Sequence, residues 1–242
     1  MIISQGPISF LESILFTLHA GDMTTSTSIH SYHLLSGVYD SLATLWSWGQ
    51  IAKSRNQAIG KLMRHSNILI LGPGTCQGFE AFGKGNSNLT LVDSSAEMLQ
   101  ARGGEWKAGL NSLPTVHICD VREYQPHQRF DCIWLPYFLN VFSTGEVIAM
   151  LSEFKSWLKD SGEIHISDFM APDTRWFLRL FQEAWHGLPM AFFHAVTGNA
   201  WHSIHDLPRL ISDAGFQMTD TLPTGFGPSS HPWIGNYVCK PL

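Results

Sequence analysis

The segment 67–78, NILILGPGTCQG, decides the fold class. Its first part, Asn67–Leu71, is a nearly continuous apolar run, which is typical of a strand buried on both faces of a parallel sheet. The run ends in Gly-Pro-Gly, and we expect a helix from about Gln77 to Phe82. Glycines at such a strand-to-helix turn let the backbone come close to a bound nucleotide. The segment therefore predicts the first strand of an α/β sheet, followed by a cofactor-binding turn.

The remainder of the chain keeps alternating between strand and helix patterns. We expect further strands at 89–92, 115–119, 131–135, 163–166, 217–222 and 236–239, and helices ending near 98 and at 144–158, 174–200 and 206–214. A loop rich in Gly and Pro joins the last two strands, as in an antiparallel hairpin. The pattern predicts an α/β fold with a doubly wound, Rossmann-like, seven-stranded sheet and an antiparallel last strand.

A helical cap is expected before the sheet, and a helical insertion within it. Apolar residues recur at helical spacing over 28–63, where Gly37, Gly49 and Gly60 would separate two or three short helices. A stretch rich in Trp and Phe follows the strand 163–166 and forms the insertion. The expected domains are an N-terminal helical cap over 1–65 and a main domain over 66–242, with a lid insertion at 172–204.

Charge and composition exclude some classes of function. The chain has 15 Lys and Arg against 20 Asp and Glu, and no stretch gathers the basic residues into a stripe, so nucleic acid is not expected as a partner. Charged residues make up 14%, against the roughly 25% usual for soluble domains, while the aromatic share is 12%. The excess apolar surface should line a pocket, a lid or a subunit interface.

The four cysteines, Cys76, Cys119, Cys132 and Cys239, are scattered along the chain. They form neither a metal-ligand spacing nor a disulfide framework, so we expect no metal and interpret them as reduced, mostly buried thiols of a cytoplasmic protein. The first Lys or Arg is Lys53, which leaves no charged region at the start of the chain. Neither a signal peptide nor stable membrane insertion is expected.

An acidic residue closes the second expected strand. Asp93 follows Gly72 by 21 residues, where a carboxylate can accept hydrogen bonds from both ribose hydroxyls of a nucleoside. Dinucleotide enzymes share this feature. On these residues alone, a nicotinamide and an adenosylmethionine cofactor both stay open.

The remaining strand ends favour the second cofactor. The segments Ile68–Cys76 and Leu91–Leu99 resemble motifs I and II of class I S-adenosylmethionine-dependent methyltransferases that act on small molecules, especially the ubiquinone and menaquinone type. The resemblance implies S-adenosyl-L-methionine as the cofactor, with Asp93 at the ribose, Met98 near the adenine and Asp120 at the adenine amino group. The cofactor-binding residues that it implies are Gly72, Pro73, Gly74, Asp93, Ser94, Met98, Asp120, Val121 and Leu135. Asp93 and Asp120 have the alternative role of helix caps, and Met98 that of a core residue.

Two positions depart from the family pattern. Ile70 stands where family members commonly carry an acidic residue that meets the cofactor ammonium, and Cys76 replaces the third glycine. Backbone carbonyls near Gly72 are an alternative partner for the ammonium. The pair Tyr39-Asp40 resembles an element near the start of the quinone-type enzymes, where it belongs to the cover of the substrate and cofactor; a packed aromatic is the alternative for Tyr39.

Methyl transfer is an in-line displacement, so the protein has to align the reactants, exclude water and in some cases remove a proton. The candidate catalytic residues are His194, His202 and Tyr137, with His205 and Asn140 also considered. Each has a structural alternative as a packed or capping residue. Asp168, at the end of the expected strand 163–166, is either a turn residue or part of the active site.

The aromatic insertion bears on the acceptor. Its large side chains are Trp176, Phe177, Phe181, Trp185, Phe192 and Phe193, and 46–48 adds more from the cap. They favour an apolar or aromatic small-molecule acceptor, or alternatively a homodimer interface. Transfer to an O or N atom is expected, with a C atom as a variant. The other hypotheses are a methyltransferase-like cyclase, isomerase or regulatory partner, and a nicotinamide oxidoreductase, which the lack of a Tyr-x-x-x-Lys pair disfavours.

Overall fold

The computed structural model describes residues 39–101, 104–197, 203–225, 227 and 232–242. Its sheet has seven strands in the order β3-β2-β1-β4-β5-β7-β6. The strands are β1 (Asn67–Leu71), β2 (Asn88–Asp93), β3 (Thr115–Ile118), β4 (Phe130–Pro136), β5 (Leu158–Phe169), β6 (Phe216–Pro223) and β7 (Ile234–Pro241). β7 runs antiparallel to both of its neighbours, and the other pairings are parallel. The expected doubly wound sheet with an antiparallel last strand is confirmed.

The helices follow the expected order with some corrections. They are α3 (Tyr39–Ser47), α4 (Gln50–Leu62), α5 (Ala96–Gln100), α6 (Thr144–Trp157), α7 (Trp176–Thr197) and α8 (Leu207–Asp213), with the 3-10 helices η1 (Phe79–Lys84), η2 (Glu105–Gly109), η3 (Val121–Glu123) and η4 (Leu139–Val141). The helix expected over 77–82 is only the short η1. Gly49 does separate α3 from α4, as expected, with a φ of 75°. The break expected at Gly60 is wrong, because this glycine lies inside α4, where nothing crowds its Cα.

Alternation along the central strands builds two cores. Ile68 and Ile70 of β1 face α4, η1 and η2, where they pack with Trp134. Leu69 and Leu71 face the opposite side and pack with α6 and α8. Every one of these side chains is buried, so the apolar run in β1 reflects a strand that is covered on both faces.

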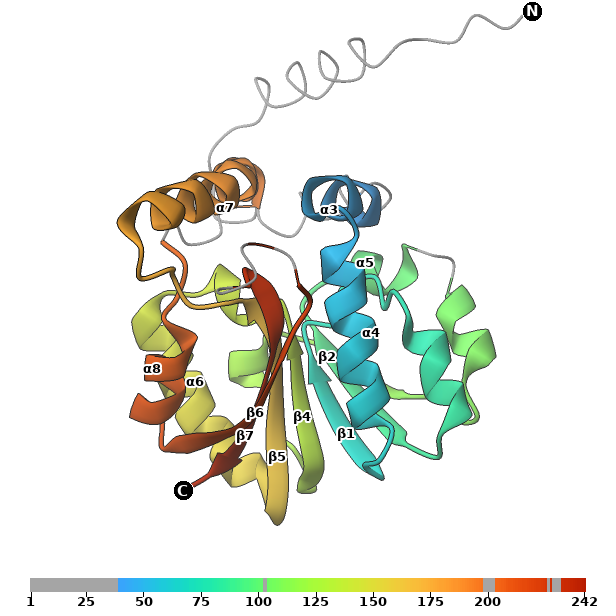
Figure 1. Cartoon of the computed structure of the whole chain (residues 1–242). Helices are drawn as coiled ribbons and strands as arrows, with labels where there is room; N and C mark the ends of the chain where they lie inside the picture. Colours follow the sequence, from blue (N-terminus) through green and yellow to red (C-terminus); the bar gives the residue numbers. More distant parts are fainter. Residues whose placement is uncertain (1–38, 102–103, 198–202, 226, 228–231) are drawn as a thin grey trace, which may run out of the picture.

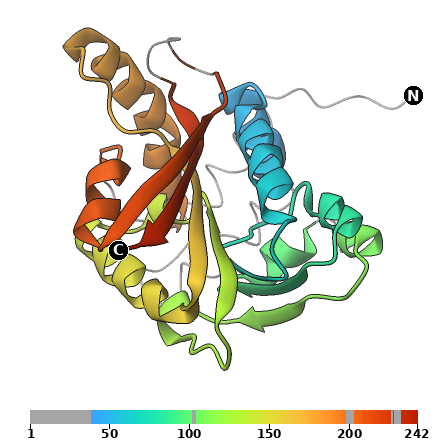
Figure 2. The same cartoon turned by 60° about the horizontal axis from the view of Figure 1, so that its bottom comes forward.

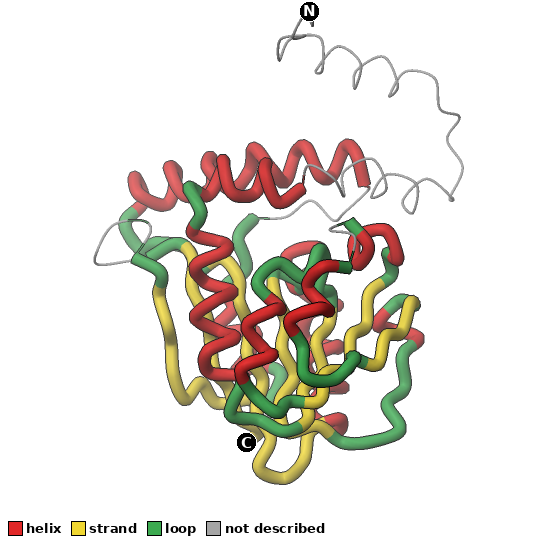
Figure 3. Tube along the Cα trace, turned by 90° about the vertical axis from the view of Figure 1, so that its right-hand side faces the viewer, coloured by secondary structure: helices red, strands yellow, loops and turns green. Residues whose placement is uncertain are grey.

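The sheet therefore lies between two helical layers. α4 and α5 cover one face, and α6 and α8 cover the other (Figure 1, Figure 2). Of the expected cap over 1–65, α4 belongs to the first layer, where Asn236 Nδ2 of β7 donates a hydrogen bond to the Ser54 carbonyl at 3.1 Å. α3 and α7 instead lie beside each other over one end of the sheet, and the length of α7 across that end is clear in Figure 3. The division into a cap and a main domain stays a prediction.

No helix in the described ranges combines the length and the apolar character that a membrane span requires.

Candidate functional site

A cavity of about 700 Å³ opens at the carboxyl ends of the parallel strands. The turns after β1, β2 and β3 form one half of it, which we call the cofactor half. Side chains from α3, α7, η4 and the end of β5 form the other, which we call the acceptor half. The cavity brings together most of the residues that the sequence singled out, namely Gly72, Gly74, Asp93, Ser94, Met98, Asp120, Val121, Tyr137 and Asn140.

The glycine turn after β1 has an unusual backbone. Gly72, Gly74 and Cys76 have φ values of 65°, 60° and 55°, all in the left-handed region that favours glycine. A Cβ on Gly72 would lie 2.6 Å from Cδ2 of Phe138. Cys76 thus takes a glycine-like conformation although it has a side chain, which is buried in the core under the turn. The departure at Cys76 leaves the path of the turn intact.

Asp93, the last residue of β2, holds this turn. Its Oδ2 accepts a hydrogen bond from the Gly74 backbone N at 3.1 Å, and its Oδ1 accepts one from the Ser95 backbone N at 2.9 Å. Burial raises the pKa of Asp93 to about 6, against the lowering effect of these two bonds. Ser95 in turn caps α5 through Met98 N. The cap of α5 is therefore Ser95, and the Asp93 carboxylate is left to the cavity and the glycine turn.

Arg55 of α4 brings a positive charge to the cofactor half. It is 5% exposed and lines the cavity, and its Nη2 donates a hydrogen bond to the Pro73 carbonyl at 3.3 Å. Its Nε is buried without a partner among the described residues. The sequence pattern gave no sign of Arg55, because α4 precedes the glycine turn and matches no cofactor motif. Ile70 points into the core on the α4 side of the sheet.

Asp120 caps a helix and also faces the cavity, so its expected contact with the adenine stays a prediction. It lines the cavity, and its Oδ1 also accepts a hydrogen bond from Arg122 N at 2.9 Å, which caps η3. The guanidinium of Arg122 pairs with the same carboxylate. This pairing lowers the pKa of Asp120, in contrast to Asp93.

Two predicted cofactor residues do not line the cavity. Leu135 is fully buried in the core shared with α6 and α8, so its assignment is corrected, and the next residue, Pro136, lines the cavity instead. Because side chains alternate along β4, Leu135 points to the face of the sheet that α6 and α8 cover. Pro73 is not among the lining residues either, and its carbonyl accepts the hydrogen bond from Arg55.

The predicted histidines do not gather at the cavity. His194 is exposed on α7 and is not among the lining residues, which corrects its assignment. His202 lies outside the described residues. His205 is buried, and its Nε2 lies 3.1 Å from the Phe142 carbonyl, so it joins the loop before α8 to the segment after β4.

An aromatic stack joins the two covering helices. Trp46 of α3 and Trp185 of α7 are stacked with ring centroids 4.0 Å apart and planes 9° apart, and Trp46 Nε1 donates to the Trp185 carbonyl at 3.2 Å. Both rings meet Phe169, at the end of β5, edge on. α3 is also tied to the glycine turn, since Asp40 accepts a hydrogen bond from the Thr75 hydroxyl at 2.7 Å. α3 therefore reaches both halves of the site, through Asp40 at the glycine turn and Trp46 in the acceptor half.

The inner face of α7 presents a histidine that the sequence analysis missed. His186 is 1% exposed, lines the cavity and packs edge on against Phe169 with ring centroids 4.7 Å apart. Gln182 and Met190, four residues to either side, are also buried. The four-residue spacing of Gln182, His186 and Met190 places them on one face of a helix, and this spacing could have identified His186 from the sequence.

Other aromatic residues of α7 point outward. Trp176, Phe177 and Phe181 are 74%, 45% and 67% exposed and do not line the cavity, which corrects the expectation that they form the acceptor pocket. The side chains of Phe192 and Phe193 lie outside the described residues. α7 thus has a buried inner face and an apolar outer face.

Tyr137 and the end of β5 close the acceptor half. Tyr137 has a φ of 57°, a strained value for a non-glycine residue of the kind that gathers at functional sites, and its backbone N donates to the Ser167 carbonyl at 2.7 Å. Asp168 is buried behind the cavity, where its Oδ1 accepts bonds from Asn140 Nδ2 at 3.2 Å and Phe169 N at 2.8 Å. Burial raises the pKa of Asp168 to about 7. Asp168 therefore positions Asn140, which lines the cavity.

Comparisons with known proteins agree with this geometry. Residues 68–162 match the family model described as a methyltransferase domain. Mitomycin 7-O-methyltransferase MmcR superposes with a TM-score of 0.61 at 15% identity, over 98% of this chain and 69% of that one. The DhpI-SAM-HEP complex gives 0.62 at 14% identity, over 90% of this chain and 100% of that one. Magnesium protoporphyrin IX methyltransferase ChlM from Synechocystis PCC 6803, with bound SAH, gives 0.51 at 14% identity, over 96% and 94%.

Residues 68–162 therefore match a methyltransferase domain, and the chain has the fold of the class I S-adenosylmethionine-dependent methyltransferases. The cofactor of this class is S-adenosylmethionine, and the residues present fit it. The left-handed glycine turn leaves its backbone open toward the cavity, and the Asp93 carboxylate faces the same space. The likeness to quinone-type enzymes in particular stays a prediction.

Proposed function

We propose that this protein transfers the methyl group of S-adenosylmethionine to an oxygen or nitrogen atom of a small apolar or aromatic metabolite, with transfer to carbon as a variant. One observation carries the proposal. A single cavity runs from the glycine turn to an apolar space bounded by Trp46, Phe169 and Met190, so that a cofactor and an acceptor fit side by side. Apolar walls with few polar groups are typical of sites for such acceptors.

In this proposal the cofactor half recognises each part of S-adenosylmethionine. Asp93 accepts hydrogen bonds from the ribose hydroxyls, while Met98 and Asp120 flank the adenine. Arg55, held at the glycine turn, lies where it can pair with the carboxylate of the methionine part. When bound there, S-adenosylmethionine would supply an electrophilic methyl group, and the aromatic rings of the acceptor half suit its positive sulfonium.

The acceptor half then aligns the nucleophile and takes its proton. His186 is the proposed proton acceptor, because it is an imidazole in the apolar part of the cavity. Asn140, oriented by Asp168, and Tyr137 orient the hydroxyl or amine. Trp46, held by its stack on Trp185, covers part of the acceptor half and would limit the access of water.

A methyl-transfer assay tests this function. The protein is incubated with S-adenosylmethionine carrying an isotopically labelled methyl group and with panels of phenols, aromatic amines and apolar alcohols. Mass spectrometry should find the label in a product from at least one panel. Binding of S-adenosylhomocysteine with an acceptor that rearranges without label would instead support the cyclase or isomerase alternative. Binding of nicotinamide nucleotides alone would contradict both.

We also propose that two copies of the chain pair through the outer face of α7. Trp176, Leu180 and Phe181 lie at helical spacing on this face and are 74%, 61% and 67% exposed. Sedimentation should show a dimer for the natural chain and a monomer for Phe181→Glu. A monomer for both would remove the dimer from the account without affecting the cavity.

A further inference from the structure

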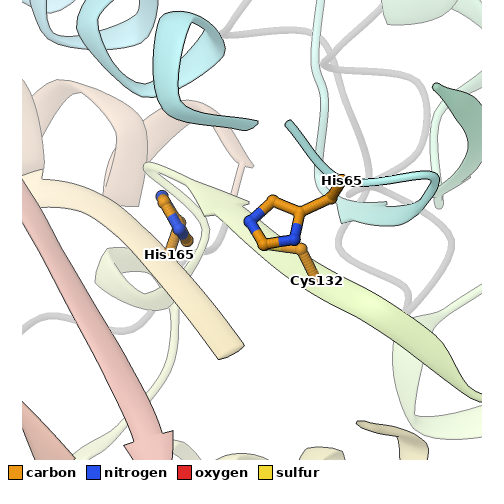
Figure 4. A group of neighbouring side chains, drawn as sticks. All are labelled: His65, Cys132 and His165. Carbon is orange, nitrogen blue, oxygen red and sulfur yellow. The ribbon is translucent and has the colours of Figure 1, made fainter. Parts of the chain in front are cut away.

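A second group of chemically active side chains lies away from the cavity, toward the amino ends of the strands. His65 precedes β1, Cys132 lies on β4 and His165 on β5, and Figure 4 shows the three side chains turned toward one another. One ring nitrogen of each histidine and the Cys132 sulfur lie within 4.8 Å of one another. None of the three lines the cavity.

The group is enclosed by the protein. Cys132 and His165 are both fully buried, and the side chain of His65 is 15% exposed. A buried thiol with two imidazoles is the donor set of Zn²⁺ and similar divalent ions, which take Cys and His ligands in tetrahedral sites. The three residues come from separate elements, so one ion would bridge the α4–β1 turn, β4 and β5.

A carboxylate orients both imidazoles. Glu163 Oε1 lies 3.0 Å from His65 Nε2 and 2.7 Å from His165 Nε2. Arg64 Nη2 also donates to the same Oε1, at 2.7 Å. Because a carboxylate can only accept, each Nε2 carries the hydrogen, and a neutral ring then keeps its lone pair on Nδ1.

The nitrogen left over on His165 has nothing to bind. His165 Nδ1 is buried, and among the described residues no group forms a hydrogen bond with it. Arg64 Nε also lies 3.3 Å from His65 Nε2; with the Nε2 hydrogen donated to Glu163, this is a close contact rather than a hydrogen bond, and it does not involve Nδ1. A carboxylate on one nitrogen and a metal on the other is the arrangement that fixes histidine ligands in metalloproteins.

We propose that His65, Cys132 and His165 bind one Zn²⁺ ion, with Glu163 as the carboxylate that orients the two rings. The imidazoles donate their Nδ1 lone pairs. The Sγ–H bond of Cys132 breaks, its proton leaves to solvent, and an S–Zn bond forms. A water molecule takes the fourth position. The thiolate and Glu163 together bring two negative charges to the ion, and the half-exposed Arg64 guanidinium pairs with the same Glu163 at the edge of the site.

This site is separate from methyl transfer and has a structural role. The ion would fasten the start of β1 to β4 and β5, at the end of the sheet opposite the cavity. Binding to the folded state alone raises stability in proportion to the logarithm of the zinc concentration. The site therefore predicts a zinc-dependent melting temperature that does not require S-adenosylmethionine.

Titration of the metal-stripped full chain with Zn²⁺ and Co²⁺ tests the proposal. We expect one ion per chain, a rise in melting temperature, and a thiolate-to-cobalt charge-transfer band in the near ultraviolet. Cys132→Ser should lose the band and weaken Zn²⁺ binding at least tenfold. Cys239→Ser is the matched control, because Cys239 is a buried free thiol on β7 outside the cluster and should leave the band and affinity unchanged. Glu163→Gln should weaken binding by roughly 10- to 100-fold.

X-ray absorption on the zinc-loaded natural chain gives a result that needs no variant. One sulfur and two imidazole nitrogens around the metal support the site, even if Cys132→Ser fails to fold. No bound zinc at micromolar concentration, a shell without sulfur, or equal bands in Cys132→Ser and the natural chain would overturn it.

Discussion

The two halves of the cavity are built in different ways. The cofactor half comes from turns that directly follow β1, β2 and β3, and its backbone conformation, with left-handed Gly72 and Gly74, is set by residues next to one another in the chain. The acceptor half depends on side chains far apart in sequence, such as Trp46 and Trp185, which are 139 residues apart. Local sequence thus specifies the turns of the cofactor half, to which the packing of α4 adds Arg55, and packing of distant elements specifies the acceptor half. Substitutions in one half should therefore leave the other half's ligand largely unaffected.

The largest effect is expected in the glycine turn. Gly74→Val puts a β-branched residue at a φ of 60°, beside Arg55 and Met98, so binding of S-adenosylhomocysteine should be lost while the fold is kept. Calorimetric titration measures the binding, and circular dichroism monitors the fold. Gly60→Ala is the control, because Gly60 lies in open space within α4, where the change should stabilise the protein by about 0.5–1 kcal/mol. Normal affinity for S-adenosylhomocysteine in Gly74→Val would mean that the glycine turn does not contact the cofactor.

The next effect belongs to the acceptor half. His186→Gln should lower kcat about 10²- to 10⁴-fold, because a proton acceptor is removed, while affinity for S-adenosylhomocysteine stays within a few-fold. The limb of the pH profile that belongs to this base should disappear as well. His194→Gln, on the same helix but exposed, should behave like the natural protein. Equal turnover in the two variants would mean that His186 only packs against Phe169.

A smaller effect is expected at the end of β2. Asp93→Ala should weaken S-adenosylhomocysteine binding at least tenfold, since bonds to an ionised acceptor contribute about 1.5–3 kcal/mol each. Because the pKa of Asp93 is raised to about 6, affinity of the natural protein should fall as the pH drops through this value and the carboxylate takes up a proton. Titrations between pH 5 and 8 measure both effects. Asp160→Ala, at an exposed position, is the control. If Asp93→Ala bound S-adenosylhomocysteine as tightly as the natural protein does, ribose recognition by Asp93 would be excluded.

The last effect concerns stability rather than binding, at the wall behind the acceptor half. Burial raises the pKa of Asp168 from 3.8 to about 7, so the folded state holds its neutral form more readily than the unfolded state. The contribution of this carboxyl group to the free energy of unfolding is therefore greatest below pH 4 and is lost as the pH rises through 7. The loss is on the order of 2–4 kcal/mol, at about 1.4 kcal/mol per pKa unit.

Asp168→Asn should remove most of this dependence, because its amide oxygen can still accept from Asn140 and Phe169. Urea unfolding of the protein without ligands at pH 5 and pH 8 measures it. An unchanged pH dependence in the variant would assign the effect to another group.

Sequence patterns predicted the sheet well, for a physical reason. Strands covered on both faces must be apolar along their whole length, and β1 shows this directly in Asn67–Leu71. The bounds of β5 were too short, since Leu158–Phe169 includes the polar residues Lys159 and Asp160 at its start, where the strand is not covered. The predicted helix break at Gly60 was wrong, because a helix tolerates a single glycine at modest cost.

The site was predicted unevenly. Asp93 and the glycine turn follow from position along the chain, whereas Arg55 and His186 reach the cavity only through the packing of α4 and α7. Leu135 was assigned one residue away from the lining Pro136, because alternation along a strand reverses the direction of each successive side chain. The His65, Cys132 and His165 group has no spacing that a sequence pattern could detect, since its members come from separate elements.

A crystal structure with bound S-adenosylhomocysteine is the decisive measurement. We expect the ribose hydroxyls on the Asp93 carboxylate, the adenine between Met98 and Asp120, and the sulfur directed toward the space bounded by Phe169 and His186. A ligand bound elsewhere, or one whose sulfur points away from that space, would contradict the division of the cavity into a cofactor half and an acceptor half.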